Sequence, residues 1–214
     1  MAAGYTLFGS KGSGSAIVEA AFAVLGIAYR NVDAVSWEPG PGRDELARVN
    51  PLCQIPTLVL PDGAVLTESA AILIHLALAH PDSALLPADP ARRAQVLRGL
   101  VYVAANCYAA IGIIDYPERW CADADDDTNR RIKAGATARL HYLWDVFADQ
   151  FPASPFLTGE RLGALDLMAV VVSKWSGARR HLAASRPRFA ALLATIESDP
   201  RVAPVLARHW PPSA

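Results

Sequence analysis

Two patterns of apolar and polar positions divide the chain. The first 80 residues switch between short apolar runs of strand type and longer runs with helical spacing, whereas apolar residues after position 90 recur only with the period of a helix. β-branched and aromatic residues favour strands, and the predicted strands are 4–9, 27–32, 57–60 and 64–66. Helices are predicted at 16–25, 43–49 and 68–79. This β-α-β-α-β-β-α order makes the first two strands parallel, because a helix connects them.

The second pattern begins after a proline-rich segment. His80 to Ala91 contains three prolines and has no sustained apolar period, which predicts a linker over 81–89. The helices predicted beyond it are 90–113, 127–150, 164–176, 187–197 and 200–208. We therefore expect an α/β domain at 1–80 and an all-α domain at 90–214.

Composition narrows the class of protein. The chain has 214 residues, 52% of them hydrophobic and 19% charged, with a net charge of −1, so no excess of basic residues suggests nucleic acid or an anionic membrane as a partner. No uninterrupted apolar stretch approaches the roughly 20 residues of a membrane span. The three cysteines are widely spaced, which argues against a disulfide framework and a structural zinc site and favours a reducing cytoplasm.

The stretch from Asn50 to Ile72 combines two features of a peptide-binding site. Ile55-Pro56 precedes a strand, where a cis peptide is plausible and would leave the Ile55 backbone free to pair with an extended ligand. Glu68 and Ser69 open a helix, and the N–H groups at a helix start favour a carboxylate. An extended backbone partner next to a carboxylate pocket predicts a site for a small peptide.

The loop from Ser10 to Ser15 permits three interpretations. Gly12-Ser-Gly14 between a strand and a helix, with Asp33 further on, resembles a dinucleotide-binding fingerprint. Ile17 occupies the third glycine position of that fingerprint, and the chain does not continue as further βαβ units. The alternative is that hydroxyls and N–H groups at this helix start stabilise a thiolate, since helix N-termini lower a thiol pKa. The serines could also simply cap the helix.

Taken together, these segments resemble the glutathione S-transferase family over the whole chain. The resemblance is carried by Asn50-Pro-x-x-Gln-Ile-Pro-Thr-Leu, the following Asp-Gly, and Thr67-Glu68-Ser69-Ala-Ala-Ile. It implies a thioredoxin-like domain with a mixed four-stranded sheet, followed by a helical bundle. It also implies a cis-proline at Pro56, pairing of the Ile55 backbone with the glutathione cysteine, and a γ-glutamyl group held by Glu68 and Ser69. The glutathione-binding residues expected from it are Gln54, Ile55, Pro56, Glu68 and Ser69.

The catalytic group expected from the resemblance is a serine. Tyrosine-type members carry a tyrosine where this chain has Phe8, and cysteine-type members carry a loop cysteine that is absent here. The usual serine column falls near Gly12. We therefore predict Ser13, with Ser10 and Ser15 as alternatives, which resembles a bacterial, serine-like enzyme.

The implied activity is conjugation of glutathione, as co-substrate and without a metal, to a small hydrophobic electrophile. A detoxifying cytoplasmic homodimer is the form that the resemblance implies. Two alternatives stay open: a non-catalytic glutathione- or protein-binding relative, and a glutathione-dependent isomerase or reductase. Tyr102, Asn106 and Tyr108 could line the second-substrate pocket, and Asp166 is expected to cap the helix that follows Gly163.

Overall fold

The computed structural model describes residues 4–211, and its contacts divide the chain into two compact units. The sheet unit runs to Leu86 and resumes at Ile196, and the helical unit is Pro87–Thr195. The first boundary lies inside the predicted linker. The second differs from the predicted domain 90–214, because the residues from Ile196 onward group with the sheet.

The sheet unit contains the predicted mixed sheet of four strands. Its strands are β1 (Tyr5–Gly9), β2 (Tyr29–Asp33), β3 (Thr57–Val59) and β4 (Val65–Leu66). Their order is β2-β1-β3-β4; β1 and β2 are parallel, whereas β3 is antiparallel to both β1 and β4. The sheet therefore does not continue as a doubly wound parallel sheet, in agreement with the argument against a dinucleotide site.

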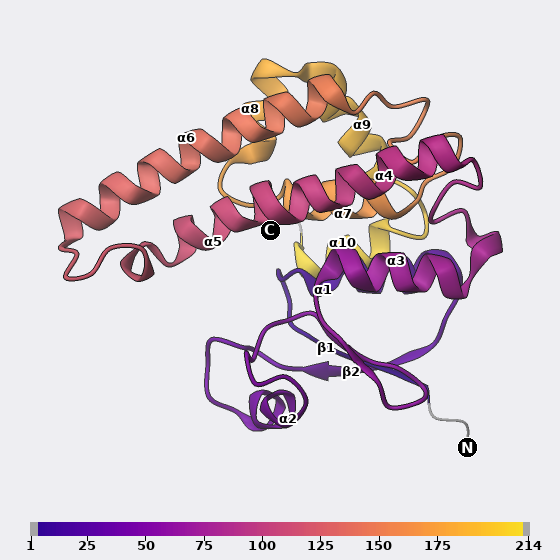
Figure 1. Cartoon of the computed structure of the whole chain (residues 1–214), viewed down its shortest axis with the longest axis horizontal. Helices are drawn as coiled ribbons and strands as arrows, with labels where there is room; N and C mark the ends of the chain where they lie inside the picture. Colours follow the sequence, from indigo (N-terminus) through magenta and orange to yellow (C-terminus); the bar gives the residue numbers. More distant parts are fainter. Residues whose placement is uncertain (1–3, 212–214) are drawn as a thin grey trace. The chain divides into compact units, whose positions relative to one another are not determined.

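Helices cover both faces of this sheet. They are α1 (Ser15–Leu25), α2 (Pro41–Val49), α3 (Ser69–Ala79) and α10 (Ala203–His209), with a 3₁₀ turn at Pro81–Ser83. Figure 1 shows α1 and α3 on one face and α2 on the other, where Leu46 of α2 packs with Phe8 and Ala34. Helix α1 contacts α3 and α10. Gly26 ends α1 in the left-handed conformation (φ 66°) that glycine adopts at low cost.

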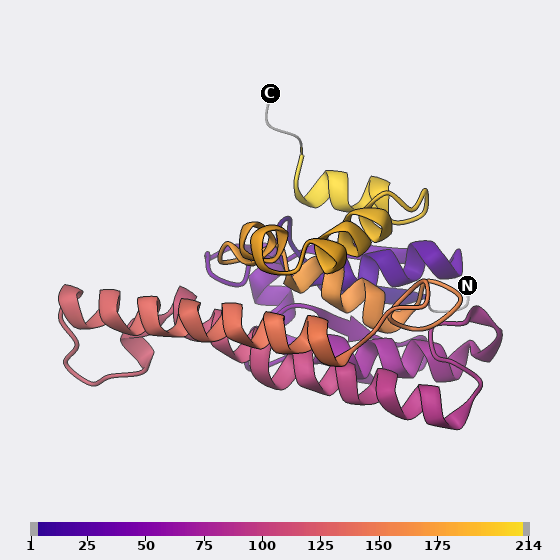
Figure 2. The same ribbon diagram turned by 90° about the horizontal axis from the view of Figure 1, so that it is seen from above.

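The helical unit is built from six α-helices and two short irregular turns among the described residues. The α-helices are α4 (Pro90–Tyr102), α5 (Ala109–Asp115), α6 (Asp126–Gln150), α7 (Ala164–Val172), α8 (Ala178–Ser185) and most of α9 (Pro187–Glu197). A π-helical segment, Val103–Tyr108, joins α4 to α5, and a 3₁₀ turn covers Pro117–Arg119. Figures 1 and 2 show α6 returning along α5, its packing partner.

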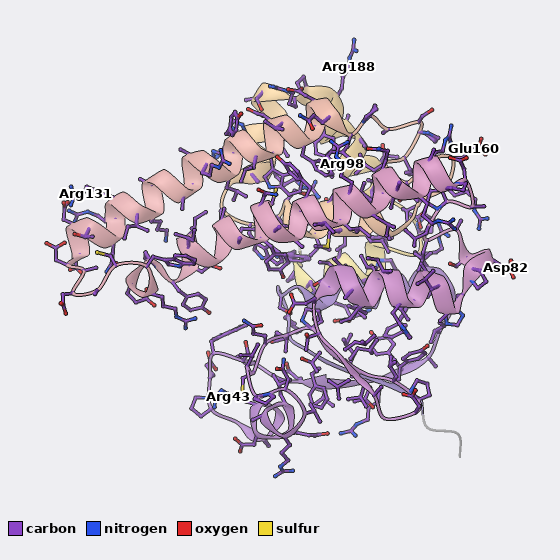
Figure 3. All side chains as sticks on the ribbon, in the orientation of Figure 1. Arg43, Asp82, Arg98, Arg131, Glu160 and Arg188 are labelled. Carbon is purple, nitrogen blue, oxygen red and sulfur yellow. The ribbon has the colours of Figure 1, made fainter. Side chains whose placement is uncertain are left out.

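Helix α4 is tied to its neighbours by one arginine and one glycine. Arg98, labelled in Figure 3, donates to the side-chain oxygens of Gln95 (2.6 Å) and Gln150 (2.8 Å), and its guanidinium lies 4.4 Å from the Phe151 ring centroid. A side chain at Gly99 would meet Leu165 at 2.6 Å, so the glycine permits the close approach of α4 and α7.

The helical segment Pro90–Asp115 is long and apolar enough to cross a membrane by length and composition, with a mean hydropathy of 1.5. The sequence pattern did not predict such a stretch. Core helices of soluble proteins meet the same criterion, and this segment packs against α6 and α7.

One predicted helix was wrong in its extent. The helix expected at 164–176 ends at Val172, and the separate helix α8 was not predicted. Ser176 and Gly177 both have positive φ values (54° and 73°), which a helix cannot accommodate. The apolar run ends at Val172, and the polar residues and Gly177 that follow are signals of a helix end that the prediction did not use.

Candidate functional site

The loop before β3 is organised by two buried polar residues, Asn50 and Thr57. The side-chain nitrogen of Asn50 (Nδ2) donates to the Gln54 carbonyl (3.1 Å) and to the Thr57 hydroxyl (2.9 Å). The Thr57 hydroxyl in turn donates to the Gln54 carbonyl at 2.7 Å. The Asn50 side-chain oxygen accepts from the Leu52 amide (3.1 Å). Both residues are buried, so these bonds hold the loop from inside. The sequence motif contained both residues but did not reveal this role.

The Ile55–Pro56 peptide is cis, as predicted. Pro56 is buried, Ile55 is half-buried, and the Gln54 side chain is exposed. Within the part of the chain that the structure describes, neither the amide nor the carbonyl of Ile55 has a hydrogen-bond partner. The backbone at Ile55 can therefore pair with an extended ligand, as a further strand would.

Glu68 and Ser69 lie at the start of α3. Glu68 is exposed and has φ 63° and ψ 109°, a sparsely populated conformation that costs a residue other than glycine on the order of 1–3 kcal/mol. Its carbonyl accepts the Ile72 amide (3.0 Å), whereas no side chain caps the helix. Ser69, in the first turn, is buried. Amides of this first turn are thus available to an anionic group.

The register of the sheet brings these segments together at one end of its strands. In the β1–β3 pair Phe8 is opposite Thr57, so continuing the register by two residues makes Ser10 level with Ile55. In the β3–β4 pair Leu58 is opposite Leu66, and the same continuation makes Pro56 level with Glu68. The loop from Ser10 to Ser15 (the serine loop), the cis-proline and the start of α3 therefore converge where β1 and β4 end and β3 begins.

The predicted catalytic residue Ser13 uses its hydroxyl inside the loop. Ser13 Oγ donates to the Ser10 carbonyl at 2.7 Å, accepts from the amides of Ser10 (3.4 Å) and Ser15 (3.2 Å), and lies 3.0 Å from Ser15 Oγ. Ser13 and Ser15 are buried. Ser10 is half-buried, and among the described residues its own hydroxyl has no partner. Of the three candidates, Ser10 has the hydroxyl with the fewest contacts.

A buried carboxylate that the sequence did not single out lies beneath this loop. Glu19 of α1 accepts at Oε1 from Ser15 Oγ (3.2 Å) and from His209 Nε2 (2.8 Å), and at Oε2 from Tyr29 (3.2 Å) and Arg208 (2.8 Å). A lone acidic residue in the apolar helix 16–25 was the sequence signal for it.

The titration of this cluster follows from burial and hydrogen bonding. Burial by itself raises the pKa of Glu19, but hydrogen bonds from His209 and Arg208 outweigh it and leave the pKa below its ordinary value. Burial, together with the neighbouring Glu19 carboxylate, raises the pKa of the Tyr29 phenol to about 12. Glu19 is therefore ionised and Tyr29 protonated at neutral pH.

Tyr102, Asn106 and Tyr108 belong to the helical unit, and each contacts other residues of that unit. The Tyr102 hydroxyl donates to the Leu143 carbonyl (2.9 Å), and Asn106 donates to the Tyr102 carbonyl (3.1 Å). The ring centroids of Tyr108 and Trp175 are 5.6 Å apart. The i, i+4 alignment expected for Tyr102 and Asn106 assumes an α-helix, whereas this segment is π-helical.

A cavity of about 410 Å³ in the helical unit is lined by none of these three residues. Its walls come from the first turns of α4 and the segment after α6. Among residues 4–211, no cluster of three or more His, Cys, Asp or Glu side chains could hold a metal ion.

Comparison with known proteins gives similarities over most of the chain. The family profile described as "Glutathione S-transferase, N-terminal domain" matches residues 15–79. The chain is 30% identical to the uncharacterised GST-like protein YncG of Escherichia coli K12, over 95% of this chain and 97% of that protein. A probable maleylacetoacetate isomerase of Caenorhabditis elegans is 46% identical over 66 residues, which are 31% of this chain and 29% of the isomerase.

Solved structures match the fold. A glutathione transferase homologue from Sulfitobacter, with bound glutathione, superposes with a TM-score of 0.81 at 24% identity, over 95% of this chain and 97% of that chain. At this identity the match supports the fold, and the chemistry must be argued from the residues themselves.

Proposed function

This chain belongs to the glutathione S-transferase family, and on that premise we propose that it is a glutathione transferase that conjugates the glutathione thiolate to a small hydrophobic electrophile. The observation that carries the proposal is the convergence of Ser10, Ile55 and Glu68 at one end of the strands of the sheet.

Two parts of glutathione, its cysteine and its γ-glutamyl group, have matching groups at this end of the sheet. The cysteine backbone of the tripeptide pairs with the amide and carbonyl of Ile55, which have no partner in the described chain. The α-carboxylate of the γ-glutamyl group binds the amides of the first α3 turn and the Ser69 hydroxyl, and its ammonium group faces the Glu68 carboxylate. Gln54 and Pro56 complete the wall of the site.

The sulfur then lies over the loop at the start of α1. A free thiol has a pKa of about 8.5, and hydroxyl or amide donors at a helix N-terminus lower it. We assign the donating hydroxyl to Ser10 in preference to Ser13, because Ser13 already donates to the Ser10 carbonyl. The thiol proton leaves to solvent, the thiolate forms a bond to the electrophilic carbon, and the leaving group departs with its electron pair.

Calorimetry with glutathione tests the binding half of the proposal. Glutathione should bind, and cysteinylglycine, which lacks the γ-glutamyl group, should bind at least about tenfold more weakly, since one charged contact is worth about 1.5–3 kcal/mol. No detectable binding of glutathione would contradict the proposal.

Turnover is tested with 1-chloro-2,4-dinitrobenzene, followed by the absorbance of the conjugate. Binding without turnover over a panel of aryl halides, epoxides and enones would favour a non-catalytic relative. Ser10→Ala is the informative variant, because it removes the assigned donor without disturbing the bonds of Ser13.

Isomerisation is a second candidate, supported by the 46% identity to the probable maleylacetoacetate isomerase. The same thiolate would add to a cis double bond, allow rotation about the resulting single bond, and leave again, so that no glutathione is consumed. Incubation with a cis-enedione distinguishes the two reactions: an isomerase converts it with a constant glutathione concentration, whereas a transferase depletes glutathione.

We also propose a cytoplasmic homodimer that detoxifies electrophiles. The family membership supports this assembly, and the mass measured by size-exclusion chromatography with light scattering tests it. A monomeric mass at micromolar concentration would contradict the dimer.

A further inference from the structure

His209 joins the last helix to the serine loop across 197 positions of sequence. The Gly12 amide donates to His209 Nδ1 (3.1 Å), and His209 Nε2 lies 2.8 Å from Glu19 Oε1. The His209 side chain is only 3% exposed. Since all three residues belong to the sheet unit, this contact is internal to one compact body.

The direction of these hydrogen bonds determines the tautomer of the imidazole. A backbone amide can only donate, so Nδ1 of His209 must carry a lone pair and no proton. Nε2 therefore carries the proton and donates to the Glu19 carboxylate. The ring thus bridges the two segments, with an acceptor directed at the loop and a donor directed at α1.

Glu19 holds the other end of this bridge rigidly. Its Oε1 is shared by His209 and Ser15, and its Oε2 accepts from Tyr29 and Arg208. A buried carboxylate with four donors has no freedom to turn, because any rotation would leave donors unsatisfied in a low-dielectric interior. The orientation of the imidazole is fixed in turn.

The loop position that His209 contacts is a sensitive one. Gly12 has φ 71°, two residues after Ser10 and directly before Ser13. Ser13 binds the amide and carbonyl of Ser10, so a shift at Gly12 is transmitted to Ser10 through this short turn. Movement of Gly12 would change the direction of the hydroxyl assigned to the glutathione sulfur.

We propose that His209, oriented by Glu19, is a positioning residue that holds the Gly12 to Ser10 turn in place for the glutathione sulfur. This inference rests on the proposed function for its effect on catalysis. It concerns a side chain on the last helix, outside the Pro56 and Glu68 segments that carry the resemblance.

Two substitutions separate the two bonds of the imidazole. In His209→Asn the side-chain oxygen occupies the place of Nδ1 and can still accept the Gly12 amide, whereas the donor to Glu19 is lost. In His209→Gln the amide nitrogen reaches the place of Nε2 and can still donate to Glu19, whereas the acceptor for Gly12 is lost. His75→Gln, on α3 and outside this cluster, is the matched control for the same chemical change.

The first readout needs neither ligand nor turnover. Amide hydrogen exchange at Gly12, followed by NMR, should be slowed in the parent protein and in His209→Asn, and should be at least about tenfold faster in His209→Gln. Unprotected exchange at Gly12 in the parent protein would overturn the proposal, whatever the variants do.

The second readout is the pH profile of conjugation. His209→Gln should lower kcat by about tenfold to a hundredfold, since small misplacements of reacting groups cost that much, and should move the thiol limb of the kcat/KM profile to higher pH. His209→Asn should stay closer to the parent, and His75→Gln should match it. Equal or reversed effects of the two His209 variants would overturn the proposal.

Failure of the proposed transferase function can be distinguished from failure of the positioning role of His209. If the parent protein does not bind glutathione in calorimetry, the transferase assignment fails, while Gly12 exchange still decides whether His209 holds the loop. If glutathione binds and turns over but His209→Gln retains the parent pH profile, only the positioning role fails.

Discussion

The hydroxyl of Ser13 donates to the carbonyl of Ser10 at 2.7 Å, and this bond distinguishes Ser13, which the sequence favoured as the catalytic residue, from its alternative Ser10. Ser13 closes the turn, whereas the half-buried Ser10 keeps its own hydroxyl unengaged in the described chain. The two serines therefore differ in whether the hydroxyl is available to donate to a ligand.

Ser10→Ala should lower kcat/KM for conjugation by about tenfold to a hundredfold and raise the apparent pKa of the bound thiol, because a hydrogen bond to a charged group is worth about 1.5–3 kcal/mol. The stability of this variant should match that of the parent within about 0.5 kcal/mol. Thermal unfolding and the pH profile of turnover measure both quantities.

Ser13→Ala should affect the stability of the protein more than the pKa of the bound thiol. It should destabilise the protein by about 1–2 kcal/mol, because buried amides of Ser10 and Ser15 lose their acceptor. Any fall in turnover should follow from the altered turn and leave glutathione affinity within a few fold. If Ser13→Ala alone raised the thiol pKa and Ser10→Ala did not, the catalytic assignment would return to Ser13.

Thr57→Val should weaken the cis-proline loop with almost no change in side-chain shape. The Thr57 hydroxyl donates to the Gln54 carbonyl and accepts from Asn50, so its removal leaves two buried polar groups with fewer partners. We expect a destabilisation of about 2 kcal/mol and a rise in the glutathione dissociation constant. Thr137→Val, at a half-buried threonine on α6 whose hydroxyl donates to the Lys133 carbonyl, is the control, and equal effects of the two variants would contradict this role.

Glu19→Gln should remove part of the acid sensitivity of the fold. The pKa of Glu19 is lowered by its hydrogen bonds, so its stabilising contribution is fully present above the ordinary value of 4.5 and is lost as pH falls through the lower folded value. The stability difference between parent and variant, about 1–3 kcal/mol at pH 7, should therefore shrink as pH falls below 4.5. Urea unfolding at a series of pH values measures it, with the more exposed Glu45→Gln as control.

The three cysteines should react with N-ethylmaleimide at well-separated rates. Cys121 is exposed and should react first, whereas burial raises the pKa of the Cys107 thiol to about 12 and should protect it until the protein unfolds. In the Cys121→Ser variant, S-methylglutathione should slow the labelling of Cys53, which lies in the cis-proline loop. Unchanged Cys53 labelling under saturating ligand would argue against the proposed position of the peptide.

Asp166→Ala should cost the helical unit at least about 3 kcal/mol, because its carboxylate accepts from three buried amides and each loses its partner. These amides belong to Leu157 (2.8 Å), Thr158 (3.1 Å) and Gly163 (3.0 Å). Glu160→Ala in the same loop, exposed and labelled in Figure 3, should be neutral within about 0.5 kcal/mol. Similar unfolding temperatures of the two variants would contradict the capping role.

Local patterns in the sequence determined the order of strands and helices along the first 80 residues, and the motifs around Pro56 and Glu68 carried the resemblance that implied the mixed sheet and the cis-proline. Those features depend on neighbouring residues: the apolar run at 57–60, the proline at 56 and the Glu68-Ser69 helix start. The helix end near Val172 was missed although the apolar run stops there, and Ser176 and Gly177 beyond it have positive φ values that end the helical backbone.

Only the tertiary structure decided which polar groups meet. Ser13 and Ser10 differ because folding directs one hydroxyl into the turn, and no pattern of spacing encodes that direction. Likewise, His209 reaches Gly12 because α10 packs on α1, and a pairing across 197 positions depends on how whole helices pack. The sequence alone therefore indicated where glutathione should bind, and the fold added which side chains hold the loop from Ser10 to Ser15 in place.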